Sequence, residues 1–277
     1  MALAISAGSP LLAAMLGWSM SLFRIRGIQL QLHFTFFILL AFVAQDGWTE
    51  AQLPGLLWSL AIILAFFTCV VLHELGHSFT AMYFGIGVRR ILLMPIGGMA
   101  EFEAIPREPW REFLITIAGP AVNFAIVALL WFAPIGEDID PIEKYSWAGL
   151  VEQVFAANLV MGCFNLLPAF PMDGGRILRA VLAMRLPYLR ATAWAATAGK
   201  VVSAVAVFFA LQAPRFQLHA EPLYMLAVLF AFIFIAGEIE FRAVKRRERD
   251  DAHWREVLAR LNPVSSRPAV EPPIISL

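Results

Sequence analysis

The chain has 277 residues, of which 60% are hydrophobic and 15% are charged, and its mean hydropathy is +0.72. A soluble domain is about 45–50% apolar and about 25% charged, so this composition excludes an ordinary water-soluble domain and indicates a polytopic membrane protein. The formal net charge is zero, which excludes the overall basic bias typical of a nucleic-acid-binding protein.

The first structured element is predicted at residues 17–33, where apolar and polar residues alternate. Ile28, Leu30 and Leu32 fall on one side of an extended chain, and the intervening glutamines fall on the other. A period of two is typical of a strand or hairpin. We therefore expect residues 1–32 to form an interfacial β segment that leads into the first span.

Apolar runs predict an α-helical polytopic fold with about six transmembrane helices in a core at residues 33–240. The expected spans are 33–45, 55–84, 112–135, 149–170, 192–213 and 222–240. Between the second and third spans, residues 86–103 read "IGVRRILLMPIGGMAEFE", with strand-like runs broken by Gly97-Gly98. This segment predicts a β hairpin, so the fold should also contain a small inner-side β element.

The distribution of basic residues predicts the orientation. If both termini are inside, 18 of the 21 basic residues lie on the inner side, and the outer loops are acidic. We expect an integral multi-pass protein of a bacterial inner membrane with both termini in the cytoplasm. Residues 241–261 should form a charged inner-side helix, and the proline-rich segment 262–277 should be disordered.

The sequence HELGH, at residues 73–77, lies at the end of a stretch without charge from Gly55 to Leu72. Ionisable groups are costly in hydrocarbon and are therefore candidates for function. On a helix, His73 and His77 share a face and can bind one metal ion, while Glu74 lies beside them. This is the HExxH arrangement, in which zinc activates a water molecule and the glutamate takes its proton. The competing interpretation is a pair of buried histidines that only bond to their neighbours.

A catalytic zinc site needs a third protein ligand, and Asp173 in "NLLPAFPMDGGR" is the best candidate. His73 lies about 18 residues, or about 27 Å, along the second span, and Asp173 lies at a similar depth along the parallel fourth span. The prolines and glycines around Asp173 break the helix there and let the backbone line a cavity. The alternative is that Asp173 only caps the helix that follows.

These motifs resemble those of the site-2 protease family of intramembrane zinc metalloproteases. HELGH in a span, followed about ninety residues later by "NLLPAFPMDGGR", carries the resemblance, and "IGGMAEFE" and "AGPAVNF" are also similar to family segments. The likeness covers residues 20–240. The chain resembles the minimal form of the family, which has neither PDZ nor CBS domains.

The resemblance implies cleavage of a transmembrane protein substrate, with one Zn²⁺ per chain. His73, His77 and Asp173 match the metal ligands, Glu74 matches the general base, and Asn165 matches a residue that steadies the substrate carbonyl or oxyanion. Asn123 matches a recurring polar position that can also be a helix–helix hydrogen bond. Neither its role nor that of His33 is decided by the sequence. Membrane lipid is the other expected partner; nucleic acid is not expected, and any regulatory membrane partner is unidentified.

Because a helix hides its carbonyls, we expect the hairpin at 88–102 and the N-terminal strand to hold an unwound substrate by β-augmentation. Two other functions stay open at this level. One is a metal-ion transporter, which needs ligands along a path. The other is an integral-membrane HExxH protease of another class, acting on soluble or misfolded segments. A catalytically dead homologue is disfavoured because all four residues of the zinc motif are present.

Overall fold

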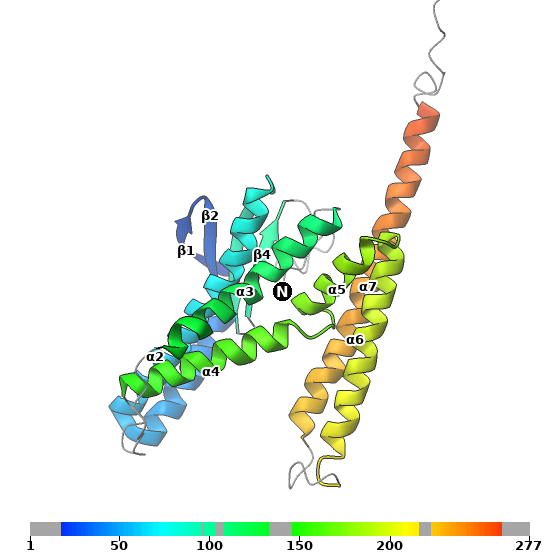
Figure 1. Ribbon diagram of the computed structural model, residues 1–277. Helices are drawn as coiled ribbons and strands as arrows, with labels where there is room; N and C mark the ends of the chain where they lie inside the picture. Colours follow the sequence, from blue (N-terminus) through cyan, green and yellow to red (C-terminus); the bar gives the residue numbers. More distant parts are fainter. Residues whose placement is uncertain (1–17, 96, 104–107, 133–145, 216–222, 262–277) are drawn as a thin grey trace, which may run out of the picture.

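The computed structural model describes residues 18–95, 97–103, 108–132, 146–215 and 223–261 as long helices with a small sheet at one side (Figure 1). Among these residues, five helices are long and apolar enough to cross a membrane. They are α2 (Thr35–Tyr83), α3 (Pro109–Trp131), α4 (Trp147–Asn165), α6 (Tyr188–Leu211) and α7 (Tyr224–Leu261). The predicted fold class is confirmed, and the chain is an integral membrane protein.

The number of spanning helices differs from the predicted six because the first two spans are joined in α2. Its 49 residues would extend for about 73 Å if straight, more than twice the hydrocarbon core. The backbone is not helical at Ala51 and Gln52, and the two halves fold back on each other. The rings of Phe36 and Phe67 meet edge to face with centroids 4.5 Å apart. The non-helical backbone at these two residues therefore divides α2 into two antiparallel halves.

The later helices lie close to their predicted positions. α4 ends at Asn165, earlier than expected, and the loop that follows leads into the short helix α5 (Asp173–Ala183). α7 continues without a break through the charged segment 241–261, which therefore extends the last apolar helix. Lys200 of α6, which lies within the expected span 192–213, pairs with Glu238 of α7 and therefore faces protein. The N-terminal residues 1–17 and the tail at 262–277 lie outside the described residues.

The two predicted β segments join in one sheet with the order β1-β2-β3-β4. The strands are β1 (Ser19–Ile25), β2 (Ile28–His33), β3 (Val88–Met94) and β4 (Gly97–Phe102). β2 and β3 are parallel, while the other two pairs are antiparallel. Parallel neighbours need a crossover connection, and α2 supplies it by leaving the sheet and returning to it. The β2–β3 pairing therefore brings both ends of α2 to the same side.

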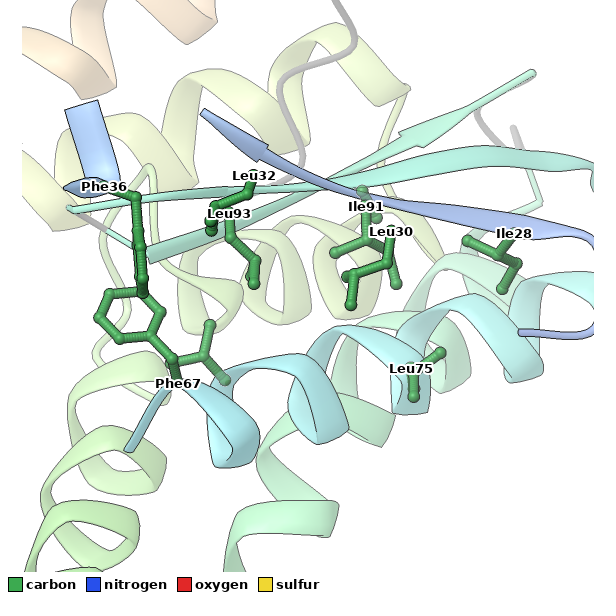
Figure 2. Close-up of a cluster of buried hydrophobic side chains, with 10 residues drawn as sticks. Ile28, Leu30, Leu32, Phe36, Phe67, Leu75, Ile91 and Leu93 are labelled. Carbon is green, nitrogen blue, oxygen red and sulfur yellow. The ribbon is translucent and has the colours of Figure 1, made fainter. Parts of the chain in front are cut away.

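The apolar face of the sheet packs on the second half of α2 (Figure 2). Along β2, buried and half-buried residues alternate, as the period of two predicted. Ile28, Leu30 and Leu32 point toward α2 and lie in one buried cluster with Phe67 and Leu75 of that helix. Burying large aliphatic or aromatic side chains contributes about 1.5–3 kcal/mol each. This cluster fixes the sheet against the turn of α2 that carries HELGH.

Candidate metal centre

The two motif histidines lie one turn apart on the second half of α2, as their spacing predicted. His73 is 4% exposed and His77 is 6% exposed. Their Nε2 atoms are 3.1 Å apart, and their ring planes are nearly perpendicular. Gly76 lies between them at the crossing with α3, where an added Cβ would be 2.8 Å from the Ala118 carbonyl oxygen. The glycine of HELGH therefore lets α3 approach the histidine face closely.

Asp173 reaches the same point from a distant part of the chain. Its Oδ2 atom lies 3.3 Å from Nε2 of His73 and 3.2 Å from Nε2 of His77. The loop between α4 and α5 is folded tightly, because Gly174 packs directly on the carbonyl oxygens of Leu166 and Leu167. The N-cap of α5 is Met172 and not Asp173, so the carboxylate does not serve as a cap.

The three side chains fit a cation. Nδ1 of His77 lies 2.7 Å from the carbonyl oxygen of Ile115, which only accepts, so this nitrogen carries the proton and Nε2 presents a lone pair. Oδ2 of Asp173 has no hydrogen-bond donor among the described residues. Buried lone pairs at 3.1–3.3 Å repel one another unless a cation lies between them. A tetrahedral zinc with bonds of 2.0–2.1 Å separates its ligand atoms by about 3.3 Å, which matches these distances.

Glu74 is also buried at this centre, although it is not one of the three converging groups. It is 2% exposed and lies against the edge strand β4. A Cβ added at Gly98 of β4 would be 2.6 Å from Cγ of Glu74, so only glycine leaves room for the carboxylate there. The sheet, the carboxylate and the histidine pair are therefore parts of one packed unit.

The other polar residues singled out from the sequence occupy different places. Asn123 contacts the centre directly, because its Oδ1 lies 2.6 Å from Nδ1 of His73. Asn165 is the half-buried last residue of α4, and its role stays a prediction. His33 bonds to Thr35 at the start of α2 and is not one of the converging ligands.

Known proteins resemble the chain over this region. The family model "Peptidase family M50" matches residues 61–136 and 133–209, which include HELGH and Asp173. The chain belongs to peptidase family M50. It is 38% identical over 230 residues to the zinc metalloprotease MJ0392 of Methanocaldococcus jannaschii, covering 83% of this chain and 62% of that protein. The stage IV sporulation protein FB of Bacillus subtilis is 28% identical over 215 residues, covering 77% of this chain and 68% of the relative.

A solved structure described as a site-2 protease from Methanocaldococcus jannaschii matches with a TM-score of 0.55 and 36% identity. The match covers 81% of this chain and 95% of that chain. The predicted resemblance to site-2 proteases is therefore confirmed. M50 relatives are named zinc metalloproteases, and the converging side chains fit zinc, so zinc is the cofactor of this centre.

Sequence reasoning missed a buried ion cluster beside the M50 site. Arg179, six residues after Asp173 on α5, is 3% exposed. Its Nε lies 2.9 Å from Oε1 of Glu112 on α3, and its Nη1 lies 3.1 Å from Oε1 of Glu240 on α7. Burial alone would lower the pKa of Arg179, but the Glu112 carboxylate raises this pKa above its usual value. The cluster ties α5, the helix that begins at Asp173, to α3 and α7.

Substitution of Gly119, on α3, should disturb the group formed by His73, His77 and Asp173 without disturbing the helix. A Cβ at this position would be 2.8 Å from Cε1 of His73 and closer still to Nε2 of His77. We expect Gly119→Ala to reduce zinc affinity by about tenfold or more, since the ligand rings must move. Zinc bound per purified chain, measured by elemental mass spectrometry during chelator titration, checks this.

Gly237→Ala is the matched control for this prediction. It makes the same change in a spanning helix, but the nearest atom to the added Cβ is 3.9 Å away. This variant should bind zinc like the wild type. Equal zinc affinity in the Gly119→Ala variant would show that α3 does not confine the histidine rings.

Proposed function

We propose that the chain is a zinc-dependent endopeptidase that hydrolyses peptide bonds within or next to the transmembrane segment of membrane-bound substrates. The observation that carries this proposal is the position of the centre. Three ligand side chains and Glu74 are buried where α2 and α3, two helices apolar enough to span a membrane, cross each other. A substrate therefore has to bring its peptide bond to this depth.

The residues divide the chemistry between them. His73, His77 and Asp173 would hold the zinc, which when bound polarises the scissile carbonyl and makes water acidic enough to lose a proton near neutral pH. Glu74 takes this proton as the water oxygen attacks the carbonyl carbon. When the C–N bond breaks, Glu74 passes the proton to the leaving amine. Asn165 is our candidate hydrogen-bond donor to the oxyanion, and the loop between α4 and α5 is our candidate path for water.

The sheet suggests how a substrate is held. β4 is an edge strand of the described sheet, and its Gly98 lies against the general base Glu74. β1 is the opposite edge, so of the two β segments expected to hold substrate, the hairpin is the one beside the centre. We propose that an unwound substrate adds to β4 by main-chain hydrogen bonds.

Cross-linking tests this β-augmentation. Met99 is 5% exposed, whereas the side chain of Glu101 on the same strand is 36% exposed, so a photo-reactive side chain belongs at Glu101. We expect an adduct with a trapped substrate from this position and none from Ser21 on β1. Adducts from β1 alone would place the substrate on the wrong edge for this proposal.

We further propose that both termini lie on the cytoplasmic side. Contacts support one common side for the basic segments: Arg90 of β3 bonds to Gln31 of β2, and Arg179 of α5 bonds to Glu112 and Glu240. The ends of α2, α3, α5 and α7 that carry the basic clusters therefore lie together. Labelling a cysteine introduced at Arg247, with a reagent that does not cross membranes, should succeed only after the inner face is opened.

Comparison of membrane proteomes from cells with the active enzyme and with its Glu74→Gln variant tests the function itself. The active enzyme should release fragments of membrane proteins that are cut inside their transmembrane segments. Fragments cut only in soluble or misfolded regions would instead favour an HExxH protease of another class.

A transporter is less well supported, because His73, His77 and Asp173 form the sole such ligand group among the described residues. Membrane-bound regulatory proteins are our more specific proposal for the substrates.

A further inference from the structure

Two buried amides follow His73 away from the centre and into the helix packing. Asn123 on α3 and Asn158 on α4 are both 0% exposed. A buried amide costs about 1–3 kcal/mol unless it is hydrogen-bonded. Gly162, one turn after Asn158, lets the helices approach, since an added Cβ would be 3.1 Å from the ring of Phe124 on α3, next to Asn123. The amides therefore face each other in a closely packed and apolar interface.

The hydrogen bonds of this pair run in one direction. Nδ2 of Asn158 lies 2.7 Å from the carbonyl oxygen of Val154, one turn earlier on α4. A carbonyl oxygen only accepts, so Oδ1 of Asn158 is left to face Asn123. Nδ2 of Asn123 donates to this oxygen at 2.9 Å. Oδ1 of Asn123 is then the atom that faces Nδ1 of His73, at 2.6 Å.

This direction decides the tautomer of His73. Because Oδ1 of Asn123 only accepts, Nδ1 of His73 must carry the proton, and Nε2 presents its lone pair to the metal centre. His77 reaches the same state by bonding to the backbone carbonyl of Ile115, which cannot turn around. The amide of Asn123 can rotate by half a turn and present its NH₂ group instead. His73 would then carry its proton on Nε2, where it blocks metal binding.

We propose that Asn158 is a positioning residue for zinc, which acts through Asn123 to hold His73 in its metal-binding tautomer. Among the described residues, the hydrogen bonds of the Asn158 side chain go to Asn123 and to the Val154 carbonyl and not to a residue of the metal centre. Its acceptor oxygen keeps the Asn123 amide from rotating, and its own orientation is set by Val154. The proposal rests on the proposed metal site and adds a residue of α4 to it. Removal of a partner of this kind costs about 10–100-fold in metal affinity.

A substitution at Asn123 separates orientation from packing. A carboxylate presents an oxygen to His73 whichever way it rotates, so Asn123→Asp needs no orienting partner. We expect Asn158→Leu to weaken zinc binding by about tenfold or more in the wild-type background. In the Asn123→Asp background the same change should weaken it less than twofold. Chelator competition on the purified full chain measures these dissociation constants without relying on proteolysis.

Two controls keep the test sharp. Asn158→Asp keeps an acceptor toward Asn123 and should bind zinc within about threefold of the wild type, which tests rescue by a conservative change. Thr192→Val removes another buried hydrogen-bonding group, the Thr192 hydroxyl, which donates to the Tyr188 carbonyl one turn earlier on α6. This variant should leave zinc binding unchanged. If Asn158→Leu does not fold, Asn158→Ala removes the same acceptor.

The outcomes distinguish this inference from the proposed function. Wild-type chain that binds no zinc would contradict the metal site itself. If the wild type binds zinc but Asn158→Leu keeps its affinity within twofold, the orienting role is wrong. An equal loss of affinity in the Asn123→Asp background would also overturn it, because packing alone would then explain the effect.

Discussion

Glu74→Gln should abolish peptide hydrolysis while the protein keeps its zinc. The two side chains have nearly the same shape, and Glu74 is not among the three converging side chains that could hold the metal, so the substitution leaves this donor set intact. An amide cannot take a proton from water or return it to the leaving amine. General acid–base catalysis contributes about 10²–10⁴-fold, so we expect a loss of at least about 100-fold in cleavage rate. Cleavage of a tethered transmembrane substrate by purified protein, with zinc content measured in parallel, checks both parts.

Glu256→Gln is the control for this variant. It makes the same chemical change on the exposed extension of α7, where Glu256 pairs with Arg260. Exposed ion pairs contribute about 0–1 kcal/mol, so neither cleavage nor zinc content should change. Cleavage by the Glu74→Gln variant at the wild-type rate would remove Glu74 from the role of general base. A simultaneous loss of zinc would instead mean that Glu74 helps to hold the metal.

Local periodicity explains why much of this fold could be predicted from the sequence. A period of two along Ile28, Leu30 and Leu32 reflects a strand with one buried face, and the structure has that face on α2. The spacing of His73 and His77 requires only one turn of helix. Asp173 could be found because depth along two parallel spans is set by residue count. Each of these inferences needs no knowledge of how the helices pack.

The features that sequence reasoning missed depend on packing. The expected spans 33–45 and 55–84 left the break of α2, at Ala51 and Gln52, correctly between them, but they did not predict that the helix continues through residues 46–50 up to this break. In α7, the sequence changes from apolar to charged without a proline, so composition marks the membrane boundary but not the end of the helix. Period and composition therefore locate elements better than they locate breaks.

The polar residues around the ligands were hidden for the same reason. Asn158 is one polar residue in an apolar run, and only its 2.9 Å hydrogen bond to Asn123 connects it with the site. Arg179 and Glu112 are 67 residues apart in the chain, and no sequence spacing relates them. Groups that orient a ligand can come from any neighbouring helix. Their identification requires the tertiary structure.

Asp173→Asn should remove most of the zinc while the chain stays folded. The substitution keeps the shape of the side chain but replaces a charged oxygen, 3.2–3.3 Å from both histidine Nε2 atoms, with a neutral amide. A catalytic zinc site typically has three protein ligands, so two imidazoles alone should hold the ion about 100-fold less tightly or worse. Because Met172 and not Asp173 is the N-cap, α5 loses only a favourable charge in its first turn, worth about 0.3–1 kcal/mol.

Glu108→Gln provides the matched control, since Glu108 is the N-cap of α3 and its side chain is 64% exposed. It changes an acid to an amide at a helix start, as Asp173→Asn does, but away from the converging ligands. Chelator titration should therefore separate the two variants, with zinc retained by Glu108→Gln and lost by Asp173→Asn. Zinc affinity within twofold of the wild type in the Asp173→Asn variant would exclude the carboxylate as a ligand. The two histidines would then need another third partner, and the assignment of α5 to the metal centre would be wrong.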